Sequence, residues 1–163
     1  NLDFYSSSFS FWKKKRYIGH DFRFPLPFNN NSFQGAYSEH VMEHLYFDES
    51  KFLLKEIYRI LKKRAVFRCT VPSLDFYIDY KKHKKNKKNK YFSRFETQCD
   101  AIRDLTCNYG HLNVWDKLTL KRELQSAGFK NVKVQSFLKG KNKNLLKDDI
   151  KKTHQTIYLE GVK

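Results

Sequence analysis

Hydrophobic side chains recur every three or four positions across residues 48–62. This spacing places them on one stripe of an amphipathic helix, and Asp48 is suited to cap its N-terminus. The stripe consists of Leu53, Ile57, Ile60 and Leu61. A second apolar stripe in residues 116–127 predicts another helix, with Gly128 where a left-handed C-cap would stand.

Short apolar runs around these helices predict strands. The clearest covers residues 65–71 and stops at Pro72, which cannot donate a ladder hydrogen bond. The other predicted strands are residues 1–4, 16–20, 33–38, 131–137 and 155–160, and further helices are predicted at residues 73–80 and 91–105. Alternating strands and helices are typical of a layered α/β sheet, and the two final strands, with no clear helix between them, predict an antiparallel edge.

Size and cysteine usage narrow the class of protein. A chain of 163 residues with 40% hydrophobic residues suits one folded domain, so we expect residues 1–163 to form a single domain. The three cysteines form no CxxC pair, which favours a reducing, cytoplasmic setting over a disulfide or zinc framework. No apolar run approaches the roughly 20 residues that span a bilayer, so we expect no membrane span.

The chain carries a net charge of +16, and residues 81–90 form a basic low-complexity run. Such a run cannot bury apolar surface and repels itself, so we expect a solvated loop or disordered insert. A basic nucleic-acid-binding module is an alternative function. We favour it less, because the excess charge is dispersed and mostly lysine, which reads bases poorly.

Acidic and small polar residues follow three of the predicted strands. Asp3 and Asp21 end the first two, and the third is followed by Ser38, Glu39 and His40. In an open α/β sheet, ligands bind beyond the carboxyl ends of the strands. Carboxylates there can accept hydrogen bonds from ribose hydroxyls or an adenine amino group.

Two long stretches resemble one known family. Residues 21–74 carry the segments DFRFPLPF, SEHVMEHL, KEIYRILK and TVPSL, and residues 109–129 carry YGHLNVWD and LKRELQSAGF. In their order and spacing these segments resemble the type 11 group of class I S-adenosylmethionine (SAM)-dependent methyltransferases. The resemblance implies a Rossmann-like sheet and SAM as cofactor.

The same resemblance implies roles for individual residues. Asp3 would bind the ribose hydroxyls, Asp21 and Phe22 would lie beside the adenine, and Ser38, Glu39 and His40 would lie near the methionine portion. His40, His44 and His111 are candidates for a base where the acceptor must lose a proton. The methyl acceptor is open to small-molecule, sugar-linked and lipid-linked compounds, because specificity in such folds comes from inserts, here residues 77–108.

The sequence departs from that family in two places. Nothing precedes Asn1, so we expect the chain to lack the family's first strand and glycine-rich cofactor loop. That strand would lie centrally, beside the strands that end at Asp3 and Ser38. Residues 62–65 (KKRA) replace the usual Pro-Gly-Gly turn, which we expect to change only the turn geometry.

Two other function classes remain as alternatives. One is a truncated, non-catalytic relative. The other is a zinc peptidase, because residues 40–44 (HVMEH) match HxxEH, which on a helix places two imidazoles one turn apart. A peptidase would need a third ligand from a downstream helix, so we assign no metal site. No Asn/Asp-Pro-Pro-Tyr/Phe motif for a flipped base is present, and no pattern indicates an oligomeric state.

Overall fold

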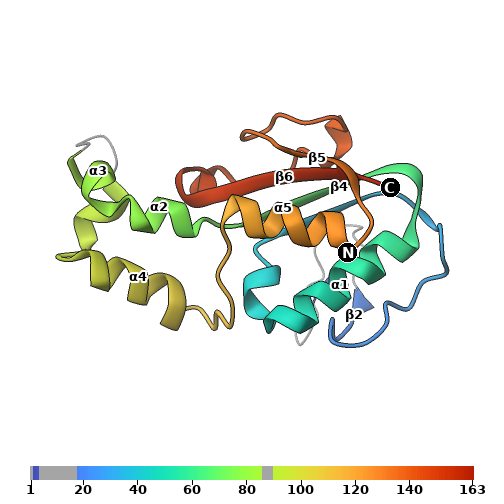
Figure 1. The fold of residues 1–163 in the computed structure, drawn as a ribbon, viewed down its shortest axis with the longest axis horizontal. Helices are drawn as coiled ribbons and strands as arrows, with labels where there is room; N and C mark the ends of the chain where they lie inside the picture. The colour runs from blue at the N-terminus through green and yellow to red at the C-terminus, as the bar shows by residue number, and fades with distance from the viewer. Residues whose placement is uncertain (1, 4–17, 86–89) are drawn as a thin grey trace, which may run out of the picture.

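The computed structural model describes residues 2–3, 18–85 and 90–163, and its centre is a four-stranded sheet. Its strands lie in the order β3 (Phe33–Glu39), β4 (Leu61–Pro72), β6 (Thr156–Val162) and β5 (Lys130–Val134). β3 runs parallel to β4, whereas β6 is antiparallel to both β4 and β5. The predicted antiparallel C-terminal edge is therefore confirmed (Figure 1).

A separate pair of parallel strands comes earlier in the chain. β1 (Leu2–Asp3) pairs with β2 (Ile18–Gly19). The ends of the two predicted strands at residues 1, 4 and 16–17 lie outside the described residues. Within the described part of the chain β3 pairs on one side only, with β4, as expected for a sheet without its central strand.

Two helices cover one face of the sheet (Figure 1). They are α1 (Phe47–Ile60) and α5 (Lys117–Ser126), and they confirm both predicted amphipathic helices. Their apolar stripes pack on the inward side chains of β4 in one core, which includes Leu53, Leu54, Ile57, Phe67, Cys69, Val71, Leu120 and Leu124.

Of the two predicted helix caps, the C-cap of α5 is confirmed and the N-cap of α1 is not. Gly128 adopts a φ of 111°, so the predicted left-handed C-cap of α5 is confirmed. The prediction of Asp48 as the N-cap of α1 is wrong. The backbone N–H of Ser50 already reaches the Tyr46 carbonyl at 2.9 Å, which starts the helix at Phe47 and places Asp48 inside the first turn.

β4 begins four residues earlier than predicted, directly at the end of α1. Phe33 of β3 lies opposite Leu61, but Gly35 lies opposite Val66, so the KKRA segment bulges out of the ladder. Arg64 in this bulge has a φ of 67°, a left-handed conformation that glycine adopts more readily than other residues. The bulge stands where the family usually has a Pro-Gly-Gly turn, and the pairing of β3 with β4 continues beyond it.

Four short helical segments form a cluster beyond one end of the sheet (Figure 1), which we call the helical cluster. They are α2 (Leu74–Ile78), α3 (Tyr80–Lys85), η2 (Lys90–Arg94) and α4 (Gln98–Cys107). The cluster has its own apolar core of Phe76, Tyr77, Tyr80, Phe92, Phe95, Ala101 and Leu105. Residues 91–105 are therefore not one helix, because η2 ends at Arg94 and α4 begins at Gln98. The Thr97 hydroxyl caps α4 by accepting from the Asp100 N–H at 3.1 Å.

The described part of the basic run, residues 81–85, is not the loop or disordered insert that the sequence predicts. Residues 81–85 continue as helix α3 rather than as a loop. Tyr80 is buried at the start of this helix, and the Lys84 ammonium donates to the carbonyls of Phe95 and Glu96 at 2.6 and 2.9 Å. These contacts anchor the helix, while residues 86–89 lie outside the described residues. None of the helices described is both long and apolar enough to cross a membrane.

A buried guanidinium ties the segment between β5 and β6 to the sheet. Arg68 of β4 is fully buried, and its Nε donates to the Asp148 carboxylate at 2.8 Å. Its remaining donors reach Glu160 at 3.2 Å and the backbone carbonyls of Lys139 and Ser136 at 2.9 and 3.1 Å. Every branch of the guanidinium thus has a partner, which a buried cation requires.

We expect Asp148→Ala to lower the free energy of unfolding by about 3–5 kcal/mol, because it leaves Arg68 buried without its main counter-charge. Urea denaturation measures the change. Asp48→Ala is the matched control, since Asp48 is an exposed acid paired with Lys51 at 2.8 Å, and removing such a pair costs less than about 1 kcal/mol. Equal losses in the two variants would show that Arg68 does not depend on Asp148.

Candidate active site

A pocket of about 350 Å³ lies where the carboxyl ends of β3 and β4 meet the helical cluster. One wall comes from the sheet side and the other from the helical cluster and the segment that follows it. The lining residues are His40, Glu43, His44, Pro72, Tyr77, Tyr91, Arg94, Leu105, Tyr109, His111, Lys152 and Gln155. The pocket is therefore at the sheet edge where ligands bind in open α/β folds.

The chain turns sharply as it leaves β3. The His40 N–H still donates to the Thr70 carbonyl at 2.9 Å, which extends the parallel pairing with β4 by one hydrogen bond. His40 itself has a φ of 51°, an uncommon conformation for a residue with a side chain. The chain then enters the 3-10 turn η1 (Met42–His44), which brings Glu43 to the base of the pocket.

Glu43 is a buried acid without compensation. Its side chain is 1% exposed, and neither carboxylate oxygen has a hydrogen-bond partner in another described residue. Its nearest titratable neighbours are imidazoles: His40 Nδ1 lies 3.4 Å and His44 Nε2 lies 4.0 Å from Oε1. Burial raises the pKa of Glu43 to about 8.

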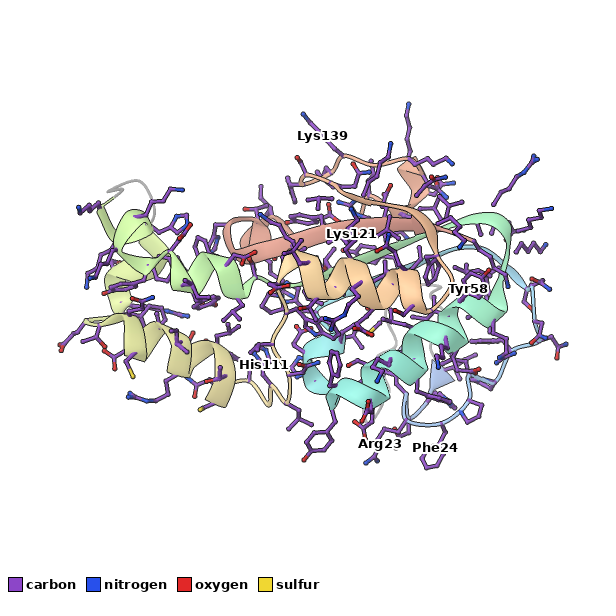
Figure 2. The ribbon with its side chains drawn as sticks, in the orientation of Figure 1. Arg23, Phe24, Tyr58, His111, Lys121 and Lys139 are labelled. Carbon is purple, nitrogen blue, oxygen red and sulfur yellow. The ribbon has the colours of Figure 1, made fainter. Side chains whose placement is uncertain are left out.

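The structure brings the three candidate bases, His40, His44 and His111, into this one pocket (Figure 2 labels His111). The rings of His44 and His111 lie 5.0 Å apart. Burial lowers the pKa of His40 to about 3, and burial also lowers the pKa of His111. Both imidazoles are therefore neutral at pH 7, as a proton acceptor must be.

Backbone carbonyls fix which nitrogen of two of these rings carries the proton. His111 Nδ1 lies 2.6 Å from the Leu105 carbonyl, and His44 Nδ1 lies 3.3 Å from the Gly110 carbonyl. A carbonyl oxygen can only accept, so each Nδ1 donates and each Nε2 keeps a free lone pair. His40 is held differently: its Nε2 lies 3.0 Å from Thr156 Oγ1, whose own hydroxyl donates to the Lys152 carbonyl.

The HxxEH segment does not form the peptidase arrangement. Residues 40–44 span a strand end and a 3-10 turn rather than an α-helix. His40 Nε2 bonds Thr156 Oγ1, and the motif lacks the α-helix that places its two imidazoles one turn apart in a peptidase. The zinc-peptidase alternative thus lacks its geometry.

The residues predicted at the adenine end lie beside β2. Asp21 follows the strand, and its carboxylate receives the Arg23 side chain at 2.6–3.0 Å and the Arg23 backbone N–H at 3.0 Å. These hydrogen bonds lower the pKa of Asp21 to about 2, so it is ionised at neutral pH. Phe22 is 8% exposed and packs in the main core. Asp3 ends β1 opposite Gly19, next to the same strand end.

The residues predicted at the methionine end lie at the carboxyl end of β3. Ser38 is 9% exposed, and its hydroxyl has no hydrogen-bond partner among the described residues. Glu39 is already used within the fold, since its Oε1 accepts the Asp149 N–H at 2.8 Å. Ser38 therefore offers a free hydroxyl at this strand end, whereas Glu39 and His40 each have one side-chain atom bonded to the segment at Asp149 or Thr156.

Most of the pocket wall escaped the sequence analysis. Tyr77, Tyr91 and Arg94 come from the insert that carries no clear periodicity, and Gln155 is the residue just before β6. The Tyr77 hydroxyl bonds both the Tyr91 hydroxyl and Gln155 Oε1 at 2.6 Å, which joins the helical cluster to β6. The only signal in the sequence was the clustering of aromatic residues in this insert.

Comparison with known proteins identifies a family model that matches most of the chain. A family model described as "Methyltransferase domain" matches residues 3–134. No match is found among the curated proteins. The segment matched by the family model runs from β1 to β5 and includes every candidate site residue identified from the sequence.

Solved structures with the same fold include three methyltransferases. An Archaeoglobus fulgidus SAM-dependent methyltransferase is 17% identical with a TM-score of 0.63, over 99% of this chain and 74% of that one. A Thermotoga maritima protein, described as a SAM-dependent methyltransferase and possible histamine N-methyltransferase, is 18% identical with a TM-score of 0.57, over 91% of this chain. Human N-acetylserotonin methyltransferase in complex with SAM is 16% identical with a TM-score of 0.54, over 97% of this chain and 36% of that one. The chain spans 64% of the Thermotoga protein's length.

We expect Ser38→Ala to leave the free energy of unfolding unchanged or to raise it by about 1 kcal/mol, because the hydroxyl is buried without a partner. Thr156→Val should instead lower it by about 1–3 kcal/mol, since it removes the acceptor of His40 and the donor to Lys152. Thermal and urea unfolding of both variants measure these changes in the free energy of unfolding. A clear loss of stability in Ser38→Ala would mean that the hydroxyl supports the fold rather than standing free for a ligand.

Proposed function

The chain belongs to the SAM-dependent methyltransferase family, and from this membership we propose that it transfers the SAM methyl group to an acceptor held in the pocket between the sheet and the helical cluster. The observation that carries the proposal is the place of this pocket, at the carboxyl ends of β3 and β4. Its lining residue His40 is two positions after Ser38, whose buried hydroxyl has no hydrogen-bond partner among the described residues. A ligand at the strand ends and an acceptor in the pocket would then be neighbours.

The described residues fit SAM at the strand ends. Asp21 is an ionised carboxylate directly after β2, suited to accept hydrogen bonds from the nucleoside, and Asp3 ends the adjacent β1. Phe22 supports this end from the core, and Ser38 and His40 offer polar groups at the end of β3. We keep Glu39 in the cofactor set through its second carboxylate oxygen, because the Asp149 N–H occupies its Oε1.

The acceptor side of the pocket is aromatic and polar. Tyr77, Tyr91 and Tyr109 supply aromatic surface, and Arg94 and Lys152 supply positive charge. We propose a small or conjugated acceptor that combines a flat or apolar part with hydrogen-bonding groups. SAM supplies an electrophilic methyl group, so the chain's task is to align the acceptor and exclude water. Where the acceptor must lose a proton, the neutral imidazoles of His40 and His111 can take it.

Calorimetric titration with S-adenosylhomocysteine tests the cofactor assignment. We expect the protein to bind it and Asp21→Ala to bind at least about tenfold more weakly, since a hydrogen bond to a charged group contributes about 1.5–3 kcal/mol. Arg23→Ala should keep the binding, because it frees the Asp21 carboxylate from its present partner. Asp48→Ala, which removes an exposed acid on α1, is the matched control.

Absence of binding by the wild-type protein would contradict the cofactor assignment. Equal affinities of the Asp21→Ala and Asp48→Ala variants would contradict the role of Asp21.

A further inference from the structure

Glu43, His44 and His111 offer three ligand atoms that all lie within 4.8 Å of one another at the base of the pocket. We propose that these three residues bind one divalent transition-metal ion of the zinc class. One carboxylate and two imidazoles are a donor set that proteins use for such ions. No function derived above requires this site, and the sequence did not predict it.

The first argument is the buried carboxylate. Glu43 is 1% exposed and accepts no hydrogen bond from another described residue, although a buried carboxylate is normally compensated. Within the described residues no lysine or arginine nitrogen lies within 4.0 Å of it, and its close titratable neighbours are the imidazoles of His40 and His44. A cation between Glu43 and the histidines supplies the missing partner.

The second argument is the orientation of the two imidazoles. Each donates from Nδ1 to a backbone carbonyl, His44 to Gly110 at 3.3 Å and His111 to Leu105 at 2.6 Å. Histidines that bind metals have this arrangement, in which the second nitrogen donates to a carbonyl or carboxylate and fixes the tautomer. Each Nε2 therefore keeps a lone pair for a metal, and His44 Nε2 already lies 4.0 Å from Glu43 Oε1.

The third argument is the way the fold holds the three ligands together. The Glu43 carbonyl accepts the N–H groups of Leu112 and Asn113 at 2.8 and 3.1 Å, which binds the η1 turn to the segment that carries His111. In a tetrahedral site with bonds of about 2.0–2.2 Å, neighbouring donors lie roughly 3.3–3.6 Å apart. The His44 side chain is 42% exposed and free to make the small movement that closes the site.

Three protein ligands leave a tetrahedral ion one position for a water or hydroxyl oxygen. The pocket is the space beside these ligands, so that position is reachable by a small molecule. The HxxEH motif thus contributes Glu43 and His44 to the site, while its first histidine is held by Thr156.

The test is zinc titration of the chelator-treated protein, in a Cys99→Ser/Cys107→Ser background because exposed free thiols are able to bind zinc. We expect one equivalent of zinc to bind. Glu43→Gln, His44→Ala and His111→Ala should each bind at least about tenfold more weakly, because even losing an outer partner of a ligand weakens binding about 10–100-fold. His20→Ala, which removes a histidine outside the pocket, should bind as before.

Thermal unfolding of each metal-free variant verifies that it is folded, and His44→Ala and Glu43→Gln decide the test if His111→Ala does not fold. Absence of zinc binding, or binding that survives both Glu43→Gln and His44→Ala, would overturn the proposal. The readout is separate from S-adenosylhomocysteine binding, so a failure of the methyltransferase assignment and a failure of the metal site are distinguishable.

Discussion

The last hydrogen bond between β3 and β4, from the His40 N–H to the Thr70 carbonyl, fixes the geometry of the whole site. It keeps β3 parallel to β4 until both strands reach the same edge of the sheet. The left-handed conformation of His40 then turns the chain across that edge, so that Glu43 enters the pocket within three residues. The strained residue persists because the ladder before it and the His40–Thr156 hydrogen bond after it hold it from two sides.

Two buried ionisable side chains, Arg68 in the sheet and Glu43 in the η1 turn, have very different surroundings. Arg68 is fully enclosed, and carboxylates and carbonyls satisfy each branch of its guanidinium, so its role is to fasten the segment before β6. Glu43 is equally buried but lacks such partners. An uncompensated buried acid lowers stability, and sites of this kind are typical of ligand-binding regions. The hydrogen bonds of Arg68 therefore stabilise the fold, whereas the Glu43 carboxylate has no such hydrogen bonds from the other described residues.

Much of the fold could be predicted because its signals are local. The stripes of α1 and α5, the glycine after α5 and the two final strands each follow from spacing within about a dozen residues. The helical cluster could not be predicted in this way. Helix α3 is basic and has no apolar stripe, and it is held by Tyr80 and by the Lys84 contacts with carbonyls 11 and 12 residues away. Tertiary contacts therefore override the local preference of that segment for a loop.

The sequence offers three candidate histidines for the pocket but does not predict how they are arranged. His40, His44 and His111 are equivalent candidates in the sequence, and nothing local tells them apart. The structure separates them by their hydrogen bonds: His44 and His111 donate from Nδ1 to carbonyls, whereas His40 donates from Nε2 to Thr156. Two rings therefore present a free Nε2 and the third presents Nδ1 to Glu43. This difference depends on Gly110, Leu105 and Thr156, which lie 66, 6 and 116 residues from their histidines, and only the folded chain brings them together.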